Sequence, residues 1–306
     1  MRTVRLGETG IETTALGFGC ADLFRLPAAG RRHLLGAAFD AGIRHYDVAP
    51  MYGLGSAERD LARFAQGRRD GLVIATKFGI TPTWAGRLLA PVQRPLVRLR
   101  GRSPGGDARS GAVGRALYRS AYDAATARRS LEQSLRTLRT DYVDLFFLHD
   151  PHPGDGLAAD VRSFLDSAVV AGTIRSWGVA REAAAVGTEV PVAQVRADIF
   201  ERPLLRVRPG AAIVFGAIGR ALPRILAHVR SDPGARRRWS EAVGADCGDA
   251  GVVAALLLRD AVRENDRGAV LFSTTHAERI GAAARAAEDD VGLHAFRALV
   301  AEELTG

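Results

Sequence analysis

Residues 42–58, GIRHYDVAPMYGLGSAE, place a carboxylate and a phenol within one short stretch of chain. A short apolar run ends at Asp47, and the glycine-containing loop that follows carries Tyr52. Two later runs have the same form, because LVIAT is followed by Lys77 and VDLFFL is followed by His149. Runs of this length and composition predict buried strands. The sequence therefore predicts several strands that each end at or near an ionisable side chain.

Strand-like and helix-like segments alternate on both sides of this stretch. The expected strands are residues 15–19, 43–48, 72–76, 143–148, 174–179, 192–195, 211–215 and 269–272. Apolar residues at helical spacing predict helices at residues 31–41, 56–64, 127–138, 161–169, 217–229, 239–262 and 277–287. No helix is evident between the sixth and seventh strands. About eight βα units without an internal linker predict an α/β fold, a single TIM (β/α)8 barrel over residues 1–306.

A doubly wound sheet is the alternative arrangement for such an alternation. It is disfavoured because no G-x-G-x-x-G motif follows the first expected strand. Two further segments stand outside the repeating pattern. Residues 1–14 read as an N-terminal β-hairpin around a Glu-Thr-Gly turn. Residues 81–119, rich in Pro, Gly and Arg, read as a long insertion loop after the third strand, which serves either as a functional lid or as a mobile, solvated loop.

Composition excludes several classes of protein. The 306 residues are 47% hydrophobic with a mean hydropathy of -0.01, and no apolar run is long enough to cross a bilayer. Without a recognisable signal segment, we expect a cytoplasmic protein without membrane contact. The two cysteines lie far apart and form no CxxC pair, so neither disulfides nor a metal site are expected. The net charge of +8 comes from scattered arginines, which does not indicate nucleic-acid binding.

Lys77 is the only lysine of the chain, although 42 residues are Lys or Arg. A composition that places Arg at every other basic position suggests that this position needs a compact ammonium group. Such a group fits a tight buried site and tunes the ionisation of a neighbour, which a planar guanidinium does less well.

The active face of a TIM barrel lies at the carboxyl ends of its strands. Asp47, Tyr52, Lys77 and His149 all lie at or just after such ends, so the topology predicts that they converge. Each residue alone has an ordinary structural explanation, as a helix cap, a rim aromatic, a surface charge or a core histidine. The four together favour a catalytic site.

In the contexts HYDVAPMYG, IATKFG and DLFFLHDP, these residues resemble the catalytic tetrad of the aldo-keto reductase superfamily. The opening VRLGETGIETTALGFGC is similar to bacterial members of its sugar-dehydrogenase branch, the relatives of L-galactose and D-threo-aldose dehydrogenases. The resemblance implies an NAD(P)(H)-dependent oxidoreductase that interconverts a carbonyl and an alcohol on a sugar-like or small-molecule metabolite. The implied cofactor is NADPH/NADP+, with NAD as the other possibility.

The resemblance also implies a role for each of the four residues. Tyr52 serves as general acid for reduction and as base for oxidation. The ammonium of Lys77 favours the phenolate form of Tyr52, and Asp47 pairs with Lys77 and orients it. His149 donates a hydrogen bond to the substrate oxygen.

Cofactor contacts match the family pattern only in part. The family holds the nicotinamide carboxamide with Ser-Asn at the end of the fifth strand and with Gln at the end of the sixth. Gln194 matches the latter, whereas Ala180 and Arg181 replace the Ser-Asn pair.

The segment after the eighth strand corresponds to the one that surrounds the adenosine phosphate in the family. Ser273 and Thr274 offer hydroxyls and backbone amides near a helix N-terminus, which is a natural anion site. Arg279 matches an arginine that binds the 2′-phosphate in some members. Ala282 and Ala283 replace a Glu-Asn pair that family members place against adenine.

Two other functions remain open at this point. The first is an enzyme with the same fold that uses the four residues for non-redox elimination or isomerisation, with weak or no nicotinamide binding. The second is a non-catalytic binding or regulatory barrel, which an intact set of four residues disfavours. In each case the expected partner is a small molecule, and the chain is expected to be a monomer or small homo-oligomer.

Overall fold

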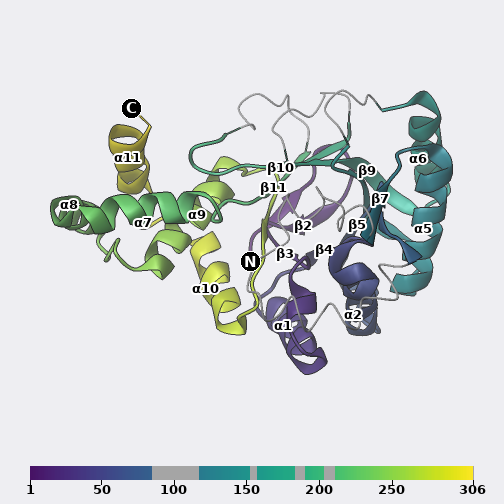
Figure 1. The fold of residues 1–306 in the computed structure, drawn as a ribbon, viewed down its shortest axis with the longest axis horizontal. Coiled ribbons are helices and arrows are strands. Elements are labelled where there is room, and N and C mark those ends of the chain that lie inside the picture. The colour runs from purple at the N-terminus through teal and green to yellow at the C-terminus, as the bar shows by residue number, and fades with distance from the viewer. Residues whose placement is uncertain (85–116, 152–156, 183–189, 203–210, 306) are drawn as a thin grey trace.

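The computed structural model describes residues 1–84, 117–151, 157–182, 190–202 and 211–305. Eight parallel strands close into a barrel, which confirms the fold class expected from the sequence (Figure 1). Around the barrel the order is β10-β11-β12-β3-β4-β5-β8-β9. The strands are β3 (Leu16–Gly19), β4 (His45–Asp47), β5 (Val73–Phe78), β8 (Val143–His149), β9 (Ile174–Arg181), β10 (Val192–Arg196), β11 (Ala211–Phe215) and β12 (Ala269–Phe272). Because all pairs are parallel, every carboxyl end opens on one face.

The barrel interior is a packed apolar core, closed at one end by a hairpin. The strands β1 (Thr3–Arg5) and β2 (Glu12–Thr14) pair antiparallel, as the sequence predicts for the first residues. Leu6 and Ile11, between them, are fully buried and belong to the same cluster as the inward-facing residues Ala75 and Phe147. The hairpin therefore closes the interior on the side opposite to the carboxyl ends.

Five amphipathic helices pack against the outer surface of the strands and bury their apolar faces there (Figure 1). They are α1 (Ala28–Asp40), α2 (Ser56–Ala65), α5 (Ala124–Leu138), α6 (Ala159–Val170) and α10 (Ala277–Glu288). Short 3-10 turns add η1 (Leu23–Arg25), η2 (Tyr52–Gly55) and η3 (Arg69–Gly71). No helix of the described ranges is long and apolar enough to cross a membrane.

Four helices form a second apolar cluster beside the barrel: α7 (Ala221–Ser231), α8 (Pro233–Val243), α9 (Ala250–Glu264) and α11 (Leu293–Leu304). The expectation of one helix over residues 239–262 is wrong. Gly244 adopts φ 77° and ends α8 in the left-handed conformation, where glycine carries no steric penalty. Asp249 then caps α9 by accepting a hydrogen bond from the Gly251 amide. The residues after 287 add α11, which the sequence analysis did not expect.

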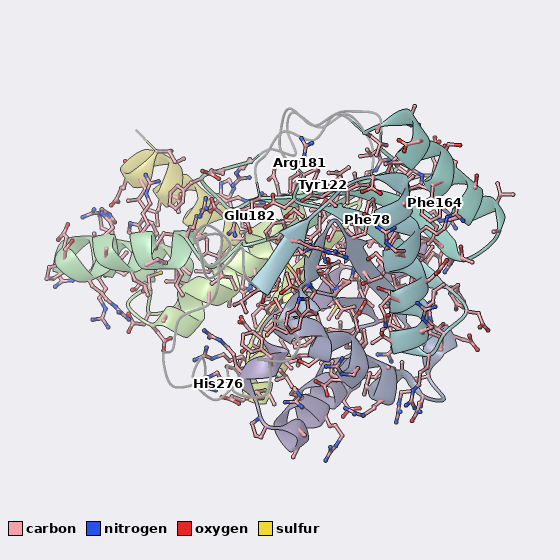
Figure 2. All side chains as sticks on the ribbon, turned by 45° about the vertical axis from the view of Figure 1, so that its right-hand side comes forward. Phe78, Tyr122, Phe164, Arg181, Glu182 and His276 are labelled. Atoms are coloured by element: carbon pink, nitrogen blue, oxygen red, sulfur yellow. The ribbon has the colours of Figure 1, made fainter. Side chains whose placement is uncertain are left out.

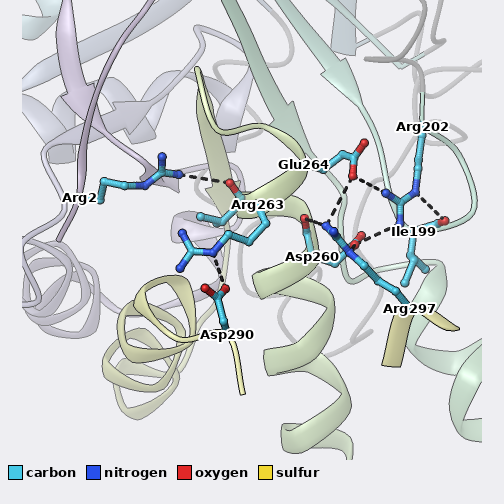
Figure 3. A network of polar contacts seen from close by, with 9 residues as sticks. Arg2, Ile199, Arg202, Asp260, Arg263, Glu264, Asp290 and Arg297 are labelled. Carbon is cyan, nitrogen blue, oxygen red and sulfur yellow. Dashed lines mark hydrogen bonds and ion pairs between the residues drawn. The ribbon is translucent and has the colours of Figure 1, made fainter. Parts of the chain in front are cut away.

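Ion pairs tie this helical cluster to the segment that leaves β10 (Figure 3). The guanidinium groups of Arg202 and Arg297 both contact Asp260, at 3.1 and 2.6 Å, and both contact Glu264. Asp260 is almost fully buried, so two cations offset the cost of removing its charge from water. The network therefore links α9 and α11 to the segment that follows β10.

The connections depart from a regular (β/α)8 pattern in two places. The ends of the expected loop at residues 81–119 are not irregular, because β6 (Ile80–Pro82) and β7 (Tyr118–Ser120) pair as an antiparallel ribbon. Residues 85–116 lie outside the described part of the chain. No helix follows β9 or β10 among the described residues, and residues 183–189 and 203–210 are likewise not described.

His45 is a buried imidazole inside the barrel. Because it is buried, we expect the folded protein to lose stability in acid. Its Nδ1 lies 3.3 Å from the Thr13 hydroxyl, and burial together with Lys77 lowers its pKa to about 3 from 6.5. Since the folded-state pKa is the lower one, stability falls as pH drops from 6.5 toward 3. The loss amounts to about 2 kcal/mol by about pH 5.

We expect His45→Asn to remove this loss of stability. The free energy of unfolding of the variant should therefore vary less than that of the wild-type protein between pH 6.5 and about pH 5. Urea denaturation at both pH values measures the difference. An equal pH dependence in the two proteins would contradict the assignment of a neutral His45.

Candidate active site

One cavity opens at the carboxyl ends of the strands, with a volume of ≈ 130 Å³. Side chains from strands across the whole barrel reach it, as expected for the active face of this fold. Six of the residues singled out from the sequence line it: Asp47, Tyr52, Lys77, His149, Gln194 and Ser273.

Asp47 and Lys77 form a buried ion pair at the floor of this cavity. Lys77 Nζ lies 2.6 Å from each carboxylate oxygen of Asp47 and also donates to the Val48 carbonyl at 3.2 Å. The two residues are 2% and 1% exposed. Burial raises the pKa of Asp47 and lowers the pKa of Lys77, while their mutual attraction acts against both shifts. The two short contacts with Asp47, together with the bond to the Val48 carbonyl, therefore hold the Lys77 ammonium in one position.

A strained turn presents Tyr52 to this ammonium. After Tyr52 the chain takes three left-handed residues, Gly53 at φ 54°, Leu54 at φ 56° and Gly55 at φ 82°. A side chain at Gly53 would lie 2.5 Å from Phe24 Cβ, so only glycine fits there. The Tyr52 ring centroid lies 5.2 Å from Lys77 Nζ. The turn thus fixes the Tyr52 ring beside the Lys77 ammonium.

His149 faces Tyr52 across the cavity. The two rings lie 5.9 Å apart and nearly perpendicular, at 87°. His149 is the last residue of β8, and the Tyr122 hydroxyl donates to its carbonyl at 2.8 Å and to the Asp150 carbonyl at 3.0 Å. Asp150 adopts φ 53°, so the chain turns sharply after His149. Figure 2 labels Tyr122 among the side chains near this end of the barrel.

The hydrogen bonding of the Gln194 side chain indicates whether a nicotinamide fits this cavity. The side chain is 3% exposed and forms a hydrogen bond with Asp47 across the barrel. Its Oε1 is buried and has no hydrogen-bond partner among the described residues. A buried carbonyl oxygen without a donor is costly, and it fits a primary amide that donates from its NH2 group. The carboxamide of nicotinamide is such a group, so Gln194 fits this cofactor.

Two further residues line the cavity on the same side as Gln194, and the first of them was not expected from the sequence. Phe215 ends β11 and lines the cavity, and the guanidinium carbon of Arg196 lies 5.1 Å from its ring centroid. An aromatic residue at the end of an expected strand was the available signal. Arg181 also lines the cavity, so a guanidinium occupies the rim where the family pattern has an amide (Figure 2).

The residues expected to hold the adenosine phosphate do not all reach the cavity. Ser273 directly follows β12 and packs against the end of β3. A Cβ atom added at Gly19 would lie 2.2 Å from the Ser273 hydroxyl oxygen. Thr274 is buried and accepts a hydrogen bond from the His276 amide, which starts α10. Arg279 is exposed on the first turn of α10, outside the cavity lining. Ala283 packs into the core and offers no polar contact.

A search of the described ranges finds no group of three or more side chains placed to hold a metal ion. His152, which follows His149 and Asp150 in the sequence, lies outside those ranges.

Comparison with known proteins agrees with the fold. The model of the aldo/keto reductase family matches residues 15–197. That match spans more than half of the chain and contains Asp47, Tyr52, Lys77, His149 and Gln194. The chain belongs to the aldo/keto reductase family.

Several named relatives share part of this sequence. D-threo-aldose 1-dehydrogenase from a Pseudomonas species is 36% identical over 178 residues, which cover 56% of this chain and 50% of that protein. Pyridoxal 4-dehydrogenase from Microbacterium luteolum is 37% identical over 153 residues, covering 47% and 42%. The chain thus spans about half the length of these curated relatives.

Solved structures extend the likeness in fold to nearly the whole chain. The glycerol dehydrogenase of Gluconobacter oxydans has a TM-score of 0.72 at 17% identity, covering 99% of this chain and 96% of that one. An aldo-keto reductase from Klebsiella pneumoniae, solved with NADPH, has a TM-score of 0.67 at 21% identity, covering 98% and 94%.

Because Asp47 and Lys77 form a buried pair, we expect their substitutions to have non-additive effects on the free energy of unfolding in a double-mutant cycle. Lys77→Met leaves the Asp47 carboxylate buried without its partner, which costs about 3 kcal/mol of unfolding free energy. Asp47→Asn combined with Lys77→Met removes both charges and recovers most of that loss. Urea denaturation of the two single variants and the double variant measures the coupling. Simple additivity of the two single effects would show that the pair is not a coupled buried unit.

Proposed function

We propose that this chain is an NAD(P)(H)-dependent oxidoreductase that interconverts a carbonyl and an alcohol on a sugar-like or other small metabolite, with NADPH as the favoured cofactor. The observation that carries the proposal is the cavity floor, where Tyr52 lies between the Lys77 ammonium and His149. Relatives named for an aldose and for pyridoxal, a sugar and an aromatic aldehyde, support this substrate class.

In the proposed reaction Tyr52 is the general acid. A carbonyl that gains hydride develops negative charge on oxygen, and Tyr52 donates its proton to that oxygen. Lys77 stabilises the phenolate left behind, and Asp47 holds Lys77 in place through the 2.6 Å contacts. His149 binds the same oxygen and sets its distance from Tyr52. In the oxidative direction Tyr52 accepts the proton.

The second half of the proposed site holds the cofactor, which supplies or accepts the hydride that no side chain can provide. Gln194 would accept a hydrogen bond from the carboxamide through its unpartnered Oε1, and Phe215, which lines the same cavity, would cover one face of the ring. Ser273 and Thr274, just before the N-terminus of α10, would offer hydroxyl and amide groups to a phosphate of the cofactor, and Arg279 on its first turn would pair with a 2′-phosphate.

A second candidate function is supported by one departure in this cofactor half. Ala180 and Arg181 replace the Ser-Asn pair that the resemblance leads one to expect, so two polar contacts to the carboxamide differ. An enzyme that keeps the four floor residues for proton transfer, without hydride transfer, fits that difference. The predicted elimination or isomerisation needs only the acid and base already present at Tyr52.

We further propose that the protein acts in the cytoplasm on small molecules, as a monomer or small homo-oligomer, without nucleic acid or a membrane as partner. The charge distribution and the absence of a long apolar helix among the described residues support this setting.

Tyr52→Phe tests the proposed function. We expect at least a 100-fold loss of NADPH-dependent reduction of a small aldehyde such as glyceraldehyde, because the proton donor is gone. NADPH affinity, measured by the enhancement of its own fluorescence, should stay within about twofold, since the ring remains in place. Full turnover by the variant would remove Tyr52 from the mechanism.

The same titration separates the two candidate functions. Saturable NADPH binding by the wild-type protein, weakened at least tenfold by Arg279→Ala, is the result expected of the oxidoreductase. Absence of binding to the wild-type protein at millimolar NADPH would instead favour the non-redox enzyme.

A further inference from the structure

One buried carboxylate next to the site takes no part in the roles assigned so far. Glu58 lies in the first turn of α2 and is 2% exposed. Its Oε1 accepts two hydrogen bonds, from the Thr76 hydroxyl at 2.9 Å and from the Ser134 hydroxyl at 2.7 Å. Both hydroxyl residues are themselves fully buried. A single oxygen thus connects three elements, α2, β5 and α5.

Those elements carry the two groups that the proposed proton transfer needs. The turn with Tyr52 runs directly into α2, so the position of the helix sets the position of the phenol. Thr76 immediately precedes Lys77 on β5, and its side chain points to the outer face while that of Lys77 points inward. Ser130, one turn before Ser134 on α5, donates to the Lys77 carbonyl at 3.5 Å.

The chemistry of this contact favours positioning over simple packing. Removing a carboxylate from water is costly, and burial raises the pKa of Glu58 although both hydroxyls lower it. Apolar side chains would fill the same space at lower cost, but apolar contacts have no preferred direction, whereas hydrogen bonds do. Hydrogen bonds of 2.7 and 2.9 Å to one oxygen fix both distance and direction.

We infer that Glu58 is a positioning residue, which holds α2 against β5 and α5 and thereby sets the place of the Tyr52 phenol relative to the Lys77 ammonium. The inference rests on the proposed function only in assigning proton transfer to Tyr52. Its physical content is the electrostatic contact between Tyr52 and Lys77, which is present without cofactor or substrate.

The test follows the ionisation of Tyr52 directly, in the cofactor-free full chain. Tyrosine labelled at its ζ carbon reports each phenol by NMR, and Tyr52→Phe identifies the Tyr52 signal. Glu58→Ala lets α2 move, so the Tyr52 midpoint should rise by about one pH unit as the ammonium moves away. Glu58→Gln keeps a carbonyl oxygen for both hydroxyls and should stay near the wild-type midpoint.

Asp60→Ala is the matched control. Asp60 lies on the same helix, is also buried, and pairs with Arg31 at 2.7 Å and Arg63 at 3.2 Å, away from β5. Its loss should destabilise the fold without moving the Tyr52 midpoint. Thr76→Val, nearly equal in shape, removes one hydroxyl and serves if Glu58→Ala does not fold; a smaller rise in the midpoint is expected.

Kinetics give the second readout, with NADPH and glyceraldehyde as the probes. For Glu58→Ala we expect kcat to fall about tenfold with NADPH affinity unchanged, because only the proton donor is displaced. Unshifted Tyr52 midpoints in both Glu58→Ala and Thr76→Val would overturn the inference and leave Glu58 a structural residue. A shifted midpoint in a protein that never oxidises NADPH would support the positioning role and reject the proposed function instead.

Discussion

The buried contact between Asp47 and Lys77 is the constraint on which the arrangement of the cavity depends. Two opposite charges, both almost fully removed from water, are stable only when each satisfies the other. Neighbouring strands meet this requirement, because β4 pairs with β5 in a register that sets Asp47 opposite Ala75, with Lys77 two residues further on the same face. The closed barrel fixes this register. The position of the ammonium, and with it the charge near Tyr52, therefore follows from strand pairing.

Much of this arrangement could be predicted from the sequence, because it depends on short-range signals. Apolar runs that end at Asp47, Lys77 and His149 mark strand ends, and parallel topology brings such ends to one face. The single lysine among many arginines also pointed to a tight site. The 2.6 Å distances agree with that reading, since the ammonium reaches both carboxylate oxygens and a backbone carbonyl at once.

Other features depend on tertiary contacts that leave little trace in the sequence. The helix expected over residues 239–262 breaks at Gly244, where apolar spacing continues while the backbone turns left-handed. Glu58 reads as an ordinary first-turn acid, favourable near a helix N-terminus, and only its two hydroxyl partners from distant segments set it apart. Phe215 likewise reaches the cavity only because the barrel closes and brings the end of β11 to the same face as the other strand ends.

The two halves of the cavity differ in how closely they follow the family pattern. On the floor, the Asp47 carboxylate contacts the Lys77 ammonium at 2.6 Å, and the Tyr52 ring centroid lies 5.2 Å from that ammonium and 5.9 Å from the His149 ring. The wall retains an acceptor at Gln194 but carries Arg181 at the rim in place of a neutral amide. The guanidinium of Arg181 thus places a positive charge beside the cavity. That charge affects the binding of cofactor and substrate, in addition to the effect of the four floor residues.

In the proposed reaction, hydride transfer is the step that needs both halves of the cavity, and isotope transfer measures it most directly. The protein would be incubated with NADPH that carries deuterium at the reactive carbon of the nicotinamide, together with glyceraldehyde, and the alcohol product analysed by mass spectrometry. Our account predicts one deuterium on the newly formed carbinol carbon when the transferred position is labelled. Conversion of the aldehyde without deuterium in the product, or tight NADPH binding with no transfer to a panel of small aldehydes and sugars, would contradict it.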